Sequence, residues 1–151
     1  MINQLVMISA GLAFLVPSAF GHDNERVGAS YGKPGDPAKI SRTVEVDMSD
    51  TMRYSPAMIQ VKKGETIRLL ARNSGQVKHE IVLGTIKELR KHAALMKKYP
   101  EMEHADANHL TVEPGKSGVM VWQFTRTGAV DFACLQPGHY EAGMRGKFAV
   151  K

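Results

Sequence analysis

Hydrophobic and polar residues alternate along most of the chain after residue 42, and this period of two predicts β-strands. The strands are expected at residues 43–48, 58–61, 66–71, 79–83, 110–112, 119–124, 129–134 and 145–151. Turn-forming residues separate them, as in Asn73-Ser74-Gly75 and Glu113-Pro114-Gly115. About seven or eight short strands joined by such turns predict an all-β protein with a β-sandwich fold.

One segment, after the strand at residues 79–83, has the helical period instead. Thr85 and Glu88 stand three residues apart, which is the spacing of a capping box. The helix is expected from about Ile86 to Tyr99, before Pro100. One side of its wheel carries Ile86, Leu89, His92, Ala93, Met96 and Tyr99, and the other carries lysine and arginine. We therefore expect an amphipathic helix, inserted into the sandwich and lying on its body.

The first 21 residues contain no Asp, Glu, Lys or Arg, and their apolar stretch from Leu5 to Val16 is short for a membrane span. Small residues at Ala19 and Gly21 fit a cleavage site. We interpret residues 1–21 as a secretory signal peptide that directs the protein to the periplasm, with an uncleaved anchor as the alternative. The polar, Gly- and Pro-rich residues 22–41 are expected to form a flexible arm, and residues 42–151 one domain without a membrane span.

Composition narrows the class of protein. Of the 151 residues, 43% are hydrophobic and 23% charged, which is typical of a single globular domain. The formal net charge of +5 is spread along the chain without a run of five like charges. This pattern argues against nucleic-acid binding and leaves acidic protein surfaces as possible partners.

The residue types of a metal site are concentrated in one segment. The only cysteine, Cys134, is followed at five-residue intervals by His139 and Met144, in a loop between the last two strands. Pro137-Gly138 favours the tight turn between Cys and His, and Gly143 relieves crowding before Met144. A lone thiol in an exported protein is a liability unless a metal protects it, although a buried inert cysteine is also common.

A second histidine is required, and His79 is the best candidate because it begins a strand after a turn and precedes an apolar run. Two imidazoles, one thiolate and a weak thioether form the trigonal set that suits copper in both of its oxidation states. Zinc more often takes a second cysteine or a carboxylate. The sequence therefore predicts copper as the cofactor.

The chain resembles the cupredoxins, the blue-copper family that includes plastocyanin, azurin, auracyanin and rusticyanin, from about Arg42 to Lys151. The residues that carry this resemblance are Tyr54-Ser55-Pro56 with Ile59 and Val61, Gly64-Glu65-Thr66, the Asn73–His79 segment, and FACLQPGHYEAGMRGKF. The resemblance implies a Greek-key β-sandwich with a type 1 copper site. In it His79, Cys134 and His139 would be the strong ligands and Met144 the axial ligand.

Two residues beside the expected ligands depart from the family pattern. Glu80 stands where Asn is frequent after the upstream histidine, and Leu135 stands where a hydroxyl is frequent after the cysteine. Both positions lie next to a ligand, so the replacements bear on colour and reduction potential. The helical insertion is more similar to cupredoxins of bacterial copper tolerance than to plastocyanin.

The insertion is itself rich in side chains that bind copper. His92, Met96, Met102, His104 and His109 fall within eighteen residues. Thioethers combined with imidazoles select Cu(I), so these residues form a candidate second site. Core packing of the methionines is the alternative. His22 would offer a further chelating pair if cleavage makes it the N-terminus.

Three functions fit these features. The first is copper tolerance, with copper binding and at most oxidation of Cu(I) at the protein's own site. The second is a diffusible one-electron carrier that docks a redox enzyme or cytochrome through an apolar patch around His139. The third, a multicopper oxidase or nitrite reductase, is disfavoured because the chain has no His-x-His pair and one domain. We expect a monomer whose partner is a redox protein or a copper-handling protein.

Overall fold

The structure is a computed structural model, and it describes residues 31–101 and 106–151. The expected signal peptide and His22 lie outside the described residues, and so do Met102 and His104. The elements are β1 (Lys33–Pro34), a 3-10 turn (Pro37–Lys39), β2 (Arg42–Ser49), β3 (Arg53–Ser55), β4 (Met58–Val61), β5 (Thr66–Asn73), β6 (His79–Gly84), α1 (Ile86–Lys98), β7 (His109–Val112), β8 (Ser117–Gln123), β9 (Gly128–Ala133) and β10 (Arg145–Val150).

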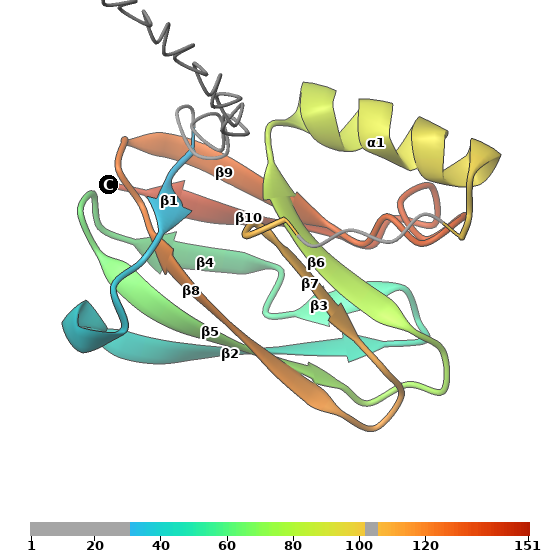
Figure 1. The fold of residues 1–151 in the computed structure, drawn as a ribbon, viewed down its shortest axis with the longest axis horizontal. Helices are drawn as coiled ribbons and strands as arrows, with labels where there is room; N and C mark the ends of the chain where they lie inside the picture. The colour runs from blue at the N-terminus through green and yellow to red at the C-terminus, as the bar shows by residue number, and fades with distance from the viewer. Residues whose placement is uncertain (1–30, 102–105) are drawn as a thin grey trace, which may run out of the picture.

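Two five-stranded sheets pack face to face, as Figure 1 shows. The first has the order β1-β8-β5-β2-β3 and the second the order β4-β10-β9-β6-β7. Both sheets are mixed, because β2 pairs in parallel with β5 and β4 in parallel with β10, while the other pairs are antiparallel. The β-sandwich with one inserted helix, expected from the sequence, is confirmed.

The core lies between the sheets and follows from the alternation along each strand. In β2, Val44, Val46 and Met48 are buried while the residues between them face outwards or are half-buried. Trp122, Phe124, Phe132 and Phe148 fill the centre, and each is at most 1% exposed. The apolar face of each sheet is thereby removed from water, which is the main stabilising contribution.

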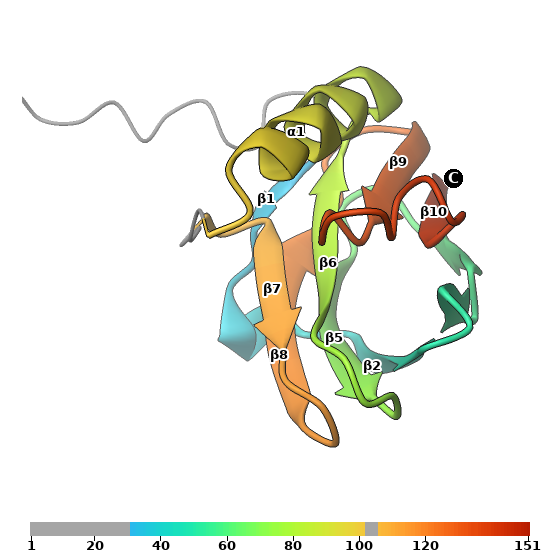
Figure 2. The ribbon, with the colours of Figure 1, turned by 90° about the vertical axis from the view of Figure 1, so that its right-hand side faces the viewer.

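The strand β6 departs from the alternation, since all six of its residues are buried. Ile81 and Leu83 point into the main core. Val82 points to the opposite side, into a second cluster under α1. One face of β6 therefore lies against the main core, and the other is covered by α1 beside Val82 and by the loop after β9 beside Glu80 (Figure 2).

The helix α1 begins and ends close to the expected residues. Thr85 caps it through the expected capping box, in which Thr85 Oγ1 accepts from the Glu88 N–H and Glu88 accepts from the Thr85 N–H. Its packed stripe is narrower than predicted, because only Leu89, Ala93 and Met96 are buried. Ile86 and Tyr99 were also expected to pack, but at opposite ends of the helix they are 46% and 53% exposed.

The end of the expected flexible arm lies against the sandwich. The short strand β1 pairs with the edge of β8, and the Tyr31 ring stacks on Trp122 with 6.0 Å between ring centroids. The arm was inferred from its glycines and prolines, but Pro34 is compatible with an edge strand. The structure thus describes a short edge strand and a 3-10 turn in this segment, and the division into a signal peptide, an arm at residues 22–41 and a domain from residue 42 stays a prediction. Within the described ranges, no helix is long and apolar enough to cross a membrane.

Candidate metal centre

The first expected ligand, His79, begins β6 directly after a short loop that Asn73 organises. The Asn73 side-chain amide donates to the backbone carbonyls of Val77 at 2.8 Å and Val112 at 2.9 Å. Its oxygen accepts from the Gly75 N–H at 2.9 Å. One buried side chain thus fixes the loop at both ends, and this sets the position from which His79 enters the sandwich.

The other three expected ligands lie on the β9–β10 loop, as the sequence predicts. Its ends are joined by a hydrogen bond from the Cys134 N–H to the Met144 carbonyl at 3.1 Å. Two further bonds, from His139 N–H to Gln136 O and from Met144 N–H to His139 O, are both 3.0 Å long. Gly138 has a φ of 87°, a conformation that most other residues adopt only with strain. The loop therefore curls as the Pro-Gly turn implied.

These segments bring three ligand atoms together. One donor atom from each of His79, Cys134 and His139 lies within 4.8 Å of the other two. Cys134 Sγ is 3.2 Å from His139 Nδ1, and the two histidine ring centroids are 5.1 Å apart. Met144 is fully buried in the same core cluster as Cys134. In the part of the chain that the structure describes, no other three His, Cys, Asp or Glu residues are grouped in this way.

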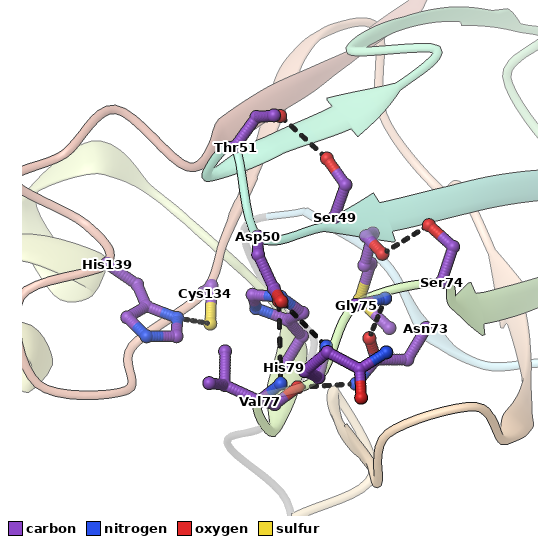
Figure 3. A network of polar contacts seen from close by, with 12 residues as sticks. Ser49, Asp50, Thr51, Asn73, Ser74, Gly75, Val77, His79, Cys134 and His139 are labelled. Atoms are coloured by element: carbon purple, nitrogen blue, oxygen red, sulfur yellow. Dashed lines mark hydrogen bonds and ion pairs between the residues drawn. The ribbon is translucent and has the colours of Figure 1, made fainter.

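The two ring nitrogens of His79 have different surroundings (Figure 3). Nε2 lies 3.1 Å from Asp50 Oδ1, whereas Nδ1 is buried and has no hydrogen-bond partner among the described residues. A buried imidazole nitrogen without a partner is costly in a protein core. The residues therefore fit a metal ion bound between Nδ1 of His79 and the neighbouring donors.

Burial controls the protonation of these groups in the metal-free protein. Desolvation raises the pKa of Cys134 to about 12, in spite of a hydrogen bond from the Glu80 N–H to Sγ at 3.3 Å. Desolvation, and then the charge of His79, lower the pKa of His139. The imidazole of His139 is thus ready to bind a cation at neutral pH, while the thiol must lose a proton first.

Glu80 and Leu135 are the two departures from the family pattern, and each follows an expected ligand in the chain. Their side chains point away from the candidate metal centre. The Glu80 carboxylate is buried, accepts a short hydrogen bond from Gln136, and lies 3.5 Å from His109 Nε2. Burial opposes its ionisation, but the hydrogen bonds from His109 and Gln136 hold the pKa of Glu80 below its usual value. Leu135 packs against α1. Each residue faces away from the ligand next to it and ties the ligand strand or loop to its neighbours.

The candidate second site is only partly within the described residues. His92 is half-buried on α1, Met96 is 1% exposed in the cluster under the helix, and His109 begins β7 beside Glu80. Neither His92 nor His109 belongs to a described group of three His, Cys, Asp or Glu donors. Because Met102 and His104 are not described, the second site stays a prediction.

Sequence reasoning did not find Asp50, which contacts His79 from the turn after β2. It accepts from the backbone N–H groups of Gln76 at 2.7 Å and Val77 at 3.4 Å. The Gln76 hydrogen bond lowers the pKa of Asp50 most, and the contact with His79 adds to this. The sequence offers little indication of the contact, since Asp50 and His79 are 29 residues apart.

Comparison with known proteins agrees with this geometry. Residues 40–151 match the family model of copper-binding proteins of the plastocyanin/azurin family. The chain is 47% identical to the copper-resistant cuproprotein CopI of Rubrivivax gelatinosus, over 97% of this chain and 94% of the relative. It is 35% identical to the protein of the same name from Pseudomonas aeruginosa, over 82% and 84%.

Solved structures support the fold. Auracyanin B superposes with a TM-score of 0.64 and 22% identity, over 82% of this chain and 96% of that one. An auracyanin from Roseiflexus castenholzii gives a TM-score of 0.62 and 22% identity, over 74% and 98%. At this level of identity, the likeness concerns the sandwich alone.

Proposed function

This chain belongs to the plastocyanin/azurin family of copper-binding proteins, and on that premise we propose that it is an exported copper-tolerance protein with one type 1 copper site. The metal of the family is copper, which agrees with the donor set of the candidate centre. The observation that carries the proposal is that donor atoms of His79, Cys134 and His139 lie within 4.8 Å of one another. Nδ1 of His79 is buried and has no hydrogen-bond partner among the described residues.

Each proposed ligand has a distinct task. His79 and His139 donate imidazole nitrogens, Cys134 donates a thiolate, and Met144 supplies a weak axial thioether. The bound metal would supply a one-electron change between Cu(I) and Cu(II). The residues around it limit movement during that change, because the Glu80 N–H holds the Cys134 sulfur and Asn73 holds the loop that leads to His79.

Copper tolerance is favoured over electron transfer by the relatives, which are named for copper resistance and match 97% and 82% of the chain. Export to the periplasm is proposed from the pattern of residues 1–21. The partner would be a copper-handling protein, and the protein would act as a monomer. The competing function is a diffusible periplasmic electron carrier, whose partner would be a redox enzyme or a cytochrome.

Two measurements test the proposal. The mature protein with one equivalent of Cu(II) should show an intense visible thiolate-to-copper band. A strain that lacks the gene should grow poorly only on elevated copper, and the wild-type gene should restore growth while Cys134→Ser should not. A growth or respiration defect at ordinary copper would instead favour the carrier, and the absence of the band would contradict the four-ligand site.

The Met- and His-rich insertion adds a second prediction, namely that Cu(I) binds at His92, Met96, Met102, His104 and His109. Soft thioethers and imidazoles suit Cu(I), and extra Cu(I) capacity would serve tolerance better than electron transfer. The test is Cu(I) titration of the wild-type protein against a variant in which His92, Met102 and His104 are replaced by alanine. Equal stoichiometry in the two proteins would contradict a second site.

A further inference from the structure

Two chain segments meet at the Asp50 carboxylate, namely the turn after β2 and the stretch from Gln76 to His79. Asp50 lies in the turn between β2 and β3, its Oδ2 accepts from the Gln76 N–H at 2.7 Å, and its Oδ1 lies 3.1 Å from Nε2 of His79. The His79 side chain is fully buried, whereas that of Asp50 is 39% exposed. The carboxylate therefore connects the loop before β6 with the interior face of the metal centre (Figure 3).

The loop is shaped to receive this carboxylate. A Cβ atom at Gly75 would stand 2.0 Å from Asp50 Oδ1 and 2.7 Å from its Cγ, closer than real atoms approach. Only glycine allows the loop to lie this near to Asp50. The neighbouring Ser74 hydroxyl donates to a different carboxylate, Asp47, at 2.7 Å. Of these two acidic residues, Asp50 is the one in contact with His79.

The contact fixes which nitrogen of His79 is free. A carboxylate can only accept a hydrogen bond from the ring, so Nε2 carries the proton and Nδ1 carries the lone pair. A partner of this kind also makes the imidazole a stronger donor to a metal. Because Cu(II) has the higher charge, a nearby negative charge stabilises it more than Cu(I).

We propose that Asp50 is a positioning residue of the copper site, which holds His79 in the Nε2-protonated tautomer and favours Cu(II) over Cu(I). This inference rests on the proposed function, since it takes His79 as a copper ligand. It adds a residue from a distant turn to the centre and names a determinant of the reduction potential. The partial exposure of Asp50 means that the effect is moderated by solvent and salt.

The test compares Asp50→Asn with Asp47→Asn, which removes the same charge from the neighbouring carboxylate that does not contact His79. Substitutions of groups that orient a metal ligand typically cost roughly 10–100-fold in metal affinity. We expect Asp50→Asn to weaken Cu(II) binding by at least about tenfold relative to Cu(I). That change raises the reduction potential by about 59 mV for one electron. Asp47→Asn should change the affinity ratio by less than about twofold.

Gly75→Ala separates position from charge, because it keeps the carboxylate and displaces it from His79. It should shift the potential in the same direction as Asp50→Asn. A second readout needs neither copper nor a variant, so misfolding of a variant does not affect it. The ¹⁵N shifts of His79 in the metal-free wild-type protein should show the Nε2-protonated tautomer.

Three results would overturn the assignment of Asp50. They are an Nδ1-protonated His79 in the metal-free wild-type protein, a potential unchanged by Asp50→Asn at full copper loading, and equal shifts in Asp50→Asn and Asp47→Asn. Failure of the wild-type protein to bind copper through Cys134 would overturn the proposed function. The three results above would overturn only the role of Asp50, so failure of the inference and failure of the proposed function are distinguishable.

Discussion

Replacing Met96 by alanine should destabilise the metal-free protein by about 3 kcal/mol, within the range of about 2–5 kcal/mol for such truncations in a core. The side chain is 1% exposed and packs under α1 with Leu89 and Ala93 of the helix, and with Leu135 and Tyr140 of the ligand loop. The loss combines removal of apolar contacts with the cavity left behind. Helix propensity contributes little, because methionine and alanine are both good helix formers.

Met96→Leu preserves the volume and should cost less than about 1.5 kcal/mol. It also removes the thioether, so it separates packing from metal binding. Leu95→Ala is the matched control: it lies in the same turn but is 41% exposed, and it should change stability by no more than about 0.5 kcal/mol. Because the proposed second site includes Met96, the leucine variant should bind less Cu(I) than the wild type, whereas an unchanged Cu(I) stoichiometry would limit Met96 to packing.

The assay is urea unfolding of the metal-free variants, followed by tryptophan fluorescence, together with Cu(I) titration. With a slope of about 2 kcal/mol per molar urea, Met96→Ala should lower the midpoint by about 1.5 M. A midpoint equal to that of the wild type would refute the packing argument. A folded Met96→Leu variant that binds one Cu(I) fewer would instead make the thioether a ligand and strengthen the case for the second site.

Three further outcomes follow from the structure. Cys134→Ser should abolish the thiolate-to-copper absorption while the protein stays folded, and a visible spectrum that keeps the band would contradict the assignment of the ligand. Because burial raises the pKa of Cys134 to about 12, copper binding should displace the thiol proton, and the apparent affinity should rise about tenfold per pH unit. The pKa of His139 is lowered, so this imidazole releases no proton on copper binding above neutral pH. A copper affinity that does not change with pH in this range would therefore contradict a protonated Cys134 thiol in the metal-free protein. Thr85→Ala should lower the free energy of unfolding by about 1 kcal/mol, because it removes the N-cap of α1. Thr85→Ser keeps the hydroxyl and should retain most of that stability. Equal unfolding midpoints for the two variants would argue against the capping box.

The sequence was sufficient where contacts are local. Cys134, His139 and Met144 lie on one loop, so their spacing alone predicts that they converge. His79 was proposed because the sequence placed the other histidines in the N-terminal arm, the helix or the loop at residues 102–109, although the structure shows that His109 begins β7. The inserted helix was predicted from its capping box and its period, both of which are properties of neighbouring residues.

Contacts that depend on sheet topology were not predictable in this way. The parallel pairing of β2 with β5 sets Met48 opposite Asn73, so the turn after β2 arrives beside the loop after β5. This register brings Asp50 to Gly75 and His79, and no local pattern encodes it. The pairing of β1 with β8 was not predictable for a similar reason, because Tyr31 and β1 contact Trp122 and its neighbours on a strand far along the chain.

The position of Leu135 explains why this chain lacks the hydroxyl that is frequent after the cysteine in the family. Consecutive residues at the end of β9 face opposite sides, so Cys134 points into the main core and Leu135 points towards α1. A hydroxyl in that apolar cluster would need a hydrogen-bond partner, whereas leucine fills the space under the helix. The helix also reaches the loop through an ion pair between Lys97 and Glu141 at 2.6 Å. The insertion therefore supports the ligand loop from outside, and the residue after the cysteine is adapted to that packing.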